Sequence, residues 1–161
     1  AGLARQGRLP RDARLVLAGR RGWMAEGLDR AIAASGVAER IVLPGFVAAE
    51  DLAALLSGAL AFVMPSLYEG FGLPVLEAMA CGTPVICSRA SSLPEVAGDA
   101  ALLFDPTDAQ ALADALLRLV TDPALRAELA ARGLARARAF TWERCAETVL
   151  RTLELVGGGH A

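Results

Sequence analysis

Two carboxylates with seven residues between them, Glu69 and Glu77, are the side chains best placed to do chemistry. They bracket a turn with Gly70 and Gly72, and Pro74 then marks the start of a helix, where proline is tolerated. A helix start offers free backbone N–H groups and a partial positive charge, which suit an anion such as a phosphate. The spacing predicts a ligand site that Glu69 approaches from the loop. Helical side chains tilt toward the N-terminus, so Glu77 can reach back to the same ligand.

The phosphate-binding donors of this site are expected to be the backbone N–H groups of Gly72, Leu73 and Val75. The turn taken alone is equally typical of a strand-to-helix connection without a ligand. Likewise, Glu69 and Glu77 taken alone fit a surface charge and a partner of the helix dipole. The dinucleotide-binding fingerprint requires a third glycine where this chain has Val75, which argues against an NAD site.

The composition excludes several kinds of function. A chain of 161 residues is long enough to bury the core of one domain, and its net charge of −2 gives no basic surface for nucleic acid. All 16 basic residues are arginine, so no lysine is present for a P-loop or a Schiff base. The single histidine, His160, argues against a metal site of paired histidines and a Ser-His-Asp triad. The 3 cysteines are odd in number and lack Cys-x-x-Cys spacing, so they are expected to be buried thiols in a reducing compartment. No apolar run is long enough to cross a membrane.

Apolar strand-like runs alternate with helical patterns, which is typical of an α/β domain with a mainly parallel sheet. Continuously apolar strands predict a sheet with helices on both faces. Ligands bind such sheets at the carboxyl ends of the strands, so loops 19–23, 44–47, 66–73 and 88–94 are expected to share one rim. The expected strands are 14–18, 41–43, 60–64, 84–87 and 101–104, and the expected helices are 24–35, 49–58, 73–80, 93–97, 108–120, 122–140 and 141–156.

Other polar side chains near this rim have ordinary explanations. Arg20 and Arg89 are expected to be solvated, with phosphate contact as the alternative. Ser91 or Ser92 is expected to cap the short helix that follows. Arg136 is expected on a solvated helix face.

Four segments resemble, in order, the C-terminal domain of retaining glycosyltransferases of family 4, which have the GT-B fold and a Glu-x7-Glu motif. They are residues 13–23 (ARLVLAGRRGW), 41–47 (IVLPGFV), 69–85 (EGFGLPVLEAMACGTPV) and 91–96 (SSLPEV). The likeness covers most of residues 13–155. It implies a Rossmann-like, nucleotide-sugar-binding domain over residues 1–156 that lacks its first strand, with a flexible tail at 157–161.

The resemblance also implies a role for each site residue. Glu77 would hydrogen-bond the ribose of the nucleotide, and Glu69, the catalytic residue, would contact the donor hexose and favour positive charge at its anomeric carbon. Carboxylates suit hydroxyls because charge-assisted hydrogen bonds are the strong ones. No metal or other cofactor is expected, since the helix dipole and cations stabilise the leaving diphosphate. The remaining donor-binding residues would be Gly70, Phe71, Gly72 and Leu73, with Gly45, Phe46 and Val47 at the base.

The resemblance implies that the intact enzyme transfers a hexose from a nucleoside-diphosphate sugar to an acceptor hydroxyl. The N-terminal acceptor domain, and the Arg and Lys that neutralise the diphosphate in relatives, are expected outside these residues, so this chain alone is expected to be inactive. The expected location is cytoplasmic or at the inner face of the membrane, with membrane contact only through the missing domain. Two alternatives remain open: a non-catalytic nucleotide-binding module, and a GT-B-type sugar-nucleotide epimerase, whose histidine and carboxylate pattern is not found here.

Overall fold

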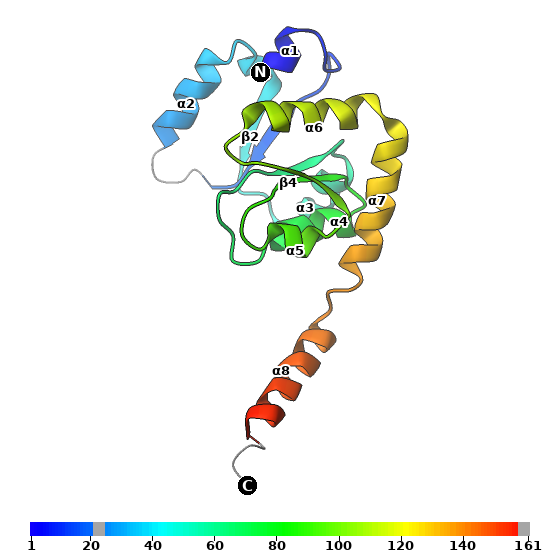
Figure 1. Ribbon diagram of the computed structural model, residues 1–161. Coiled ribbons are helices and arrows are strands. Elements are labelled where there is room, and N and C mark those ends of the chain that lie inside the picture. The colour runs from blue at the N-terminus through cyan, green and yellow to red at the C-terminus, as the bar shows by residue number, and fades with distance from the viewer. Residues whose placement is uncertain (21–24, 158–161) are drawn as a thin grey trace.

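The structure, a computed structural model, describes residues 1–20 and 25–157. Parallel strands alternate with helices, as predicted, but the strands form two sheets, of order β1-β2 and β3-β4-β5 (Figure 1). The strands are β1 (Leu15–Ala18), β2 (Ile41–Gly45), β3 (Phe62–Met64), β4 (Val85–Ser88) and β5 (Ala101–Phe104). The helices are α1 (Gly2–Arg5), α2 (Ala25–Ala34), the 3-10 turn η1 (Ala38–Arg40), α3 (Ala49–Ser57), α4 (Leu73–Ala80), α5 (Leu93–Ala97), α6 (Ala109–Thr121), α7 (Pro123–Ala137) and α8 (Trp142–Gly157).

The three-stranded sheet carries the main core. Its central strand, β4, pairs in parallel with β3 and β5 and is buried along its whole length. Successive strand residues face opposite sides of a sheet, so Val85 packs with Met79 of α4 and Leu93 of α5, whereas Ile86 packs with Leu119 of α6. In Figure 1, α6 lies above this sheet and α4 and α5 lie below it. The predicted cover of helices on both faces is therefore confirmed for this sheet.

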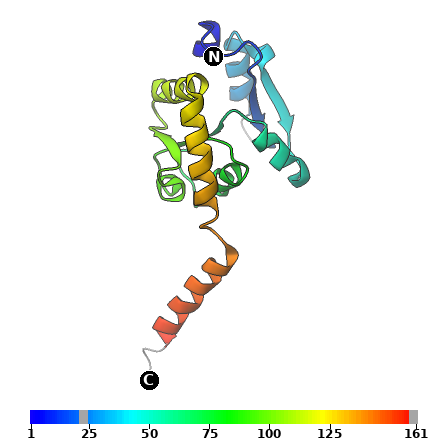
Figure 2. The ribbon, with the colours of Figure 1, turned by 90° about the vertical axis from the view of Figure 1, so that its right-hand side faces the viewer.

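The two-stranded sheet differs from this expectation. β1 and β2 pair in parallel, yet Leu15 is 51% exposed and Val42 is 43% exposed. Figure 2 shows both strands to one side of the three-stranded sheet. α3 follows β2 in the chain, and its Leu56 belongs to the core of the three-stranded sheet. The prediction that these apolar strands would be covered on both faces is wrong. With the strands divided between two sheets, β1, β2, β3 and β5 are all edge strands.

The last helix, α8, extends away from the rest of the molecule (Figures 1 and 2). None of its residues is buried, and Trp142, Val149 and Leu153 are all more than half exposed. The prediction of a buried thiol is therefore wrong for Cys145, because this helix packs against no second layer. Its bounds agree with the predicted helix to within one residue, whereas residues 158–161 of the predicted tail lie outside the described residues. No helix in the described part of the chain combines the length and apolarity needed to span a membrane.

The structure also corrects several predicted element boundaries. α1 and η1 were not predicted, because helices of one turn carry no periodic pattern. β2 continues to Gly45, so Pro44 lies within a strand, which an edge strand tolerates. β3 begins only at Phe62, and α7 ends at Ala137 rather than at 140.

Candidate functional site

The motif loop, residues 65–72, connects the end of β3 to the start of α4, as the sequence predicts. Gly72 is the N-cap residue of α4 and has a φ of 108°, a conformation that favours glycine. A Cβ atom on Gly72 would lie 2.7 Å from Leu93 Cδ2. The tight entry into α4 therefore requires glycine at this position.

The donor groups at this helix start are fewer than predicted. The Val75 N–H donates to the Gly72 carbonyl at 2.9 Å, because the first turn of α4 tightens at this point. The prediction that the Val75 N–H is free for phosphate is therefore wrong. The N–H groups of Gly72 and Leu73 donate in none of the hydrogen bonds found within residues 1–20 and 25–157, and Leu73 is exposed.

Glu69 lies in the motif loop with a half-buried side chain. The Ser66 hydroxyl donates to Glu69 Oε1 at 2.7 Å, and the Glu69 N–H donates to Ser91 Oγ at 2.9 Å. The Ser88 hydroxyl, which is fully buried, donates to the Ser66 carbonyl at 2.6 Å. The loop that follows β4 thus holds the motif loop that follows β3, which confirms that these two loops share a rim.

Ser91 and Ser92 do not cap α5 as predicted. Ser92 occupies the N-cap position, but it makes no side-chain capping bond. Its hydroxyl instead lies 3.0 Å from the Glu69 carbonyl oxygen and 2.8 Å from the Phe71 carbonyl oxygen, so its one proton is shared between these two acceptors. Capping was predicted from neighbours in sequence, whereas both hydroxyls are turned toward a loop more than 20 residues earlier.

Glu77 is the fifth residue of α4, so it lies about one helical turn after the first residue of this helix. Its neighbours Leu76 and Ala78 are buried, whereas Glu77 is exposed. Its carboxylate makes no hydrogen bond or ion pair with any described residue. The structure thus places an unpaired carboxylate on the exposed face of α4 and a fixed one, Glu69, on the loop that enters this helix.

Large side chains of the motif loop and of the first residue of α4 are packed on one side of the loop and exposed on the other. The Phe71 ring packs edge-on against the Phe140 ring, with centroids 6.0 Å apart. By contrast, Tyr68 is 80% exposed and Leu73 is 56% exposed. A ligand at the loop would therefore meet exposed apolar surface as well as polar groups.

The predicted base-contacting residues Gly45, Phe46 and Val47 lie at the end of β2. The Gly19 N–H donates to the Gly45 carbonyl at 2.8 Å, and the Arg20 guanidinium lies 5.4 Å from the centroid of the exposed Phe46 ring. The ends of β1 and β2 therefore meet, as predicted. Among the described residues, hydrogen bonds join the four predicted rim loops only within each sheet. Residues 21–23 of the first loop lie outside the described part.

Two further arginines have specific partners. The Arg89 N–H donates to the Phe104 carbonyl, and Arg89 lies close to Asp105. The hydroxyl and N–H of Thr107, and secondarily the Arg89 charge, lower the pKa of Asp105. Arg136 is half-buried and donates to the carbonyls of Glu95 and Val96 at the end of α5. The prediction of a solvated Arg136 is wrong, because its guanidinium satisfies carbonyls that the helix end leaves unpaired.

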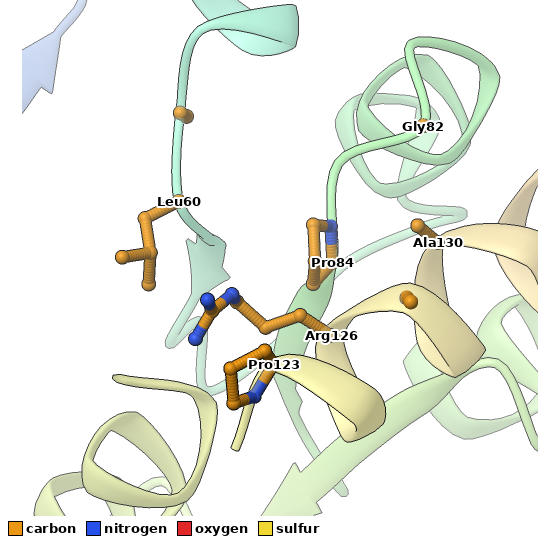
Figure 3. A pocket seen from close by; sticks show the side chains of 8 residues that line it. Leu60, Gly82, Pro84, Pro123, Arg126 and Ala130 are labelled. Atoms are coloured by element: carbon orange, nitrogen blue, oxygen red, sulfur yellow. The ribbon is translucent and has the colours of Figure 1, made fainter. Parts of the chain in front are cut away.

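A shallow hollow of about 330 Å³ lies elsewhere on the domain (Figure 3). Leu60 and Pro84, which line it, precede β3 and β4, so the hollow is at the amino ends of the strands, opposite the motif loop. Its cation, Arg126, already donates to the carbonyls of Leu119 and Val120 at the end of α6. Within the described residues, no group of three or more His, Cys, Asp or Glu side chains could hold a metal ion.

The parallel α/β architecture, with a glycine-bounded loop entering a helix at the sheet's carboxyl edge, is that of a GT-B glycosyltransferase domain. Sucrose-phosphate synthase from Thermosynechococcus elongatus superposes with a TM-score of 0.79 and 29% identity, over 99% of this chain and 49% of that one. The C-terminal domain of the LpcC glycosyl transferase from Francisella tularensis, 32% identical, gives 0.63 over 71% of this chain and 60% of that one. Anabaena HepE in complex with UDP has the same fold, with a TM-score of 0.82, 24% identity, and 94% and 43% of the two chains covered.

The chain belongs to the family Glycosyl transferases group 1, whose model matches residues 3–136. It is 44% identical, over 142 residues, to O-antigen chain mannosyltransferase B of Escherichia coli. It is also 39% identical, over 130 residues, to the MMP alpha-(1->4)-mannosyltransferase of Mycolicibacterium hassiacum. These matches cover 88% and 78% of this chain, but only 37% and 32% of the two relatives.

Proposed function

We propose that residues 1–156 form the donor-binding domain of a retaining glycosyltransferase of family 4. The whole protein would transfer a hexose from a nucleoside-diphosphate sugar to an acceptor hydroxyl. The observation that carries this proposal is the geometry of the motif loop. Glu69 is held there by Ser66 and Ser91, directly before a helix start at which Gly72 and Leu73 offer unbonded N–H groups.

Each group then has a distinct role. The helix start and the N–H groups of Gly72 and Leu73 suit the diphosphate, because both favour negative charge. The exposed and unpaired Glu77 accepts hydrogen bonds from the ribose hydroxyls. Glu69 contacts the hexose and favours the positive charge that develops at its anomeric carbon. The backbone of 45–47 contacts the base.

The rest of the proposed reaction lies outside this chain. A diphosphate beside two carboxylates needs cationic compensation, since like charges a few ångströms apart repel by several kcal/mol at intermediate dielectric. One described cation, Arg20, lies beside the predicted base loop, with its guanidinium at the Phe46 ring. Further cations and the acceptor site would come from an N-terminal domain of the same protein, and no metal cofactor would be needed. The proposed location is cytoplasmic or at the inner face of the membrane.

The experiment that tests the two carboxylate roles is calorimetric titration of the chain with UDP and with GDP. Glu77→Ala is expected to weaken binding by about 1–3 kcal/mol, the loss for hydrogen bonds to a charged group. Glu69→Ala is expected to leave the affinity nearly unchanged, because a nucleoside diphosphate carries no hexose. Glu147→Ala is the matched control, since Glu147 is an exposed helical glutamate on α8. Equal losses in the Glu69 and Glu77 variants would contradict this division of roles.

A further inference from the structure

We propose that Ser66, Ser91 and Ser92 are positioning residues of the donor site, which hold Glu69 so that its free oxygen, Oε2, meets the donor hexose. This inference rests on the function proposed above. It adds that the position of Glu69 depends on serines of its own loop and of the loop that follows β4.

The hydrogen bonds of Glu69 carry the argument. Its N–H donates to Ser91 Oγ at 2.9 Å, its carbonyl accepts from the Ser92 hydroxyl at 3.0 Å, and its Oε1 accepts from the Ser66 hydroxyl at 2.7 Å. Three of its four polar atoms are thus bonded to serines, and Oε2 has no partner among the described residues. A carboxylate with one oxygen fixed and one open can bind a ligand hydroxyl without first losing rotamer freedom.

The backbone of Ser91 is a second, independent observation. Ser91 has a φ of 49°, and it is the one non-glycine residue with a positive φ in the described part of the chain. This conformation costs free energy that a glycine would avoid. What a serine adds at this position is its hydroxyl, and that hydroxyl accepts the Glu69 N–H. Such strain is typical of sites where a side chain must be held in one place.

Buried residues hold the two loops that carry these serines. Ser88 ends the buried strand β4, and its hydroxyl holds the Ser66 carbonyl at 2.6 Å. On the other side of the loop, Gly72 lies close against the buried side chain of Leu93. The two loops are therefore fixed at both ends of the motif, which is what a preorganised site needs from its supporting residues.

The chemical consequence follows from the role of Glu69. Charge that develops at the anomeric carbon is stabilised only by groups already in position when the bond to the leaving group stretches. The nucleotide is bound by other groups. Loss of a serine hydroxyl should therefore reduce turnover and leave the affinity for the donor nearly unchanged.

The test uses the full-length protein that carries this chain, with nucleotide-sugar donors and its acceptor. Ser66→Ala and Ser91→Ala are expected to lower kcat by about tenfold to about a hundredfold, the effect of small misplacements of reacting groups, and to change the donor KM by less than about twofold. Ser66→Thr keeps the hydroxyl and should restore turnover. Ser91→Gly relieves the backbone strain, so it should raise the melting temperature and still lower kcat.

Ser35→Ala is the matched control. Ser35 Oγ also accepts a backbone N–H, that of Val37 at 3.1 Å, but it follows α2 and lies far from the motif loop in sequence. This variant should have the wild-type kcat. If Ser66→Ala and Ser91→Ala behave like Ser35→Ala, or if they raise the donor KM at unchanged kcat, the inference is overturned.

Glu69→Gln separates this failure from failure of the proposed function. If Glu69→Gln lowers kcat and the serine variants do not, only the positioning role fails. If Glu69→Gln transfers sugar as fast as the wild type, the role proposed for Glu69 fails, and the inference fails with it. A wild-type protein that transfers no sugar from any donor would refute both.

Discussion

Gly72→Ala is the substitution whose cost can be worked most directly from the structure. Gly72 has a φ of 108°, which an L-residue with a side chain adopts only under strain. The added Cβ would also lie 2.7 Å from Leu93 Cδ2, and Leu93 is fully buried, so its side chain has no solvent to move into. Both effects raise the free energy of the folded state.

The two costs can be added as an order of magnitude. Strain at an unfavourable backbone conformation costs about 1–3 kcal/mol, and one extra carbon in a well-packed core costs about 1–3 kcal/mol. A small part is offset, because alanine lowers the entropy of the unfolded chain relative to glycine, by about 0.4–1 kcal/mol. The net expectation is a loss of between about 1 and about 5.6 kcal/mol, a large share of the total stability of a small domain.

The assay is urea unfolding followed by circular dichroism, with Gly70→Ala as the matched control. Gly70 lies two residues earlier in the same loop, it is exposed, and an added Cβ would meet nothing within 4 Å. Gly70→Ala should change the free energy of unfolding by less than about 0.5 kcal/mol. Equal losses in the two variants, or a loss below about 1 kcal/mol for Gly72→Ala, would refute the explanation from φ and Leu93.

Two more expectations concern the buried thiol and the last helix. Cys87 is fully buried, and burial raises its pKa to about 11. Under native conditions a thiol reagent should therefore label the exposed Cys145 and should reach Cys87 only on unfolding. Between pH 9, the ordinary pKa of a cysteine thiol, and about pH 11, Cys87 is ionised in the unfolded chain but not in the folded one. The free energy of unfolding should therefore fall as the pH rises through this window, and an increase would contradict the raised pKa. Removal of residues after Thr141 should change the free energy of unfolding by less than about 0.5 kcal/mol, because α8 buries no residue; a larger loss would show that α8 packs on the domain.

Local signals in the sequence were sufficient for much of the fold. Pro74 and Gly82 bracket α4, which is found at its predicted bounds of Leu73–Ala80. The Asp108 carboxylate caps α6 as predicted, because it accepts the N–H groups of Gln110 and Ala111. In each case the residues that decide the structure are neighbours in the chain.

Features that depend on distant partners could not be predicted. Ser92 is a good N-cap residue by type, but its hydroxyl bonds to the motif loop instead of to the start of α5. The sequence does not show which of these two partners the hydroxyl takes. Arg136 has the pattern of a surface residue, but its guanidinium reaches the end of α5, 40 residues earlier. Leu15 is as apolar as a core residue and is half exposed, because burial depends on whether a second layer covers the strand. The Glu69 and Glu77 positions were predicted, but the serines around Glu69 were not.

Nuclear magnetic resonance can show directly whether the motif loop and the start of α4 bind a nucleoside diphosphate. The chain, labelled with nitrogen-15, would be titrated with UDP and with GDP while the backbone amide shifts are recorded. Weak binding is expected, with the largest shift changes over residues 69–77. Shift changes confined to residues 124–140 would contradict it.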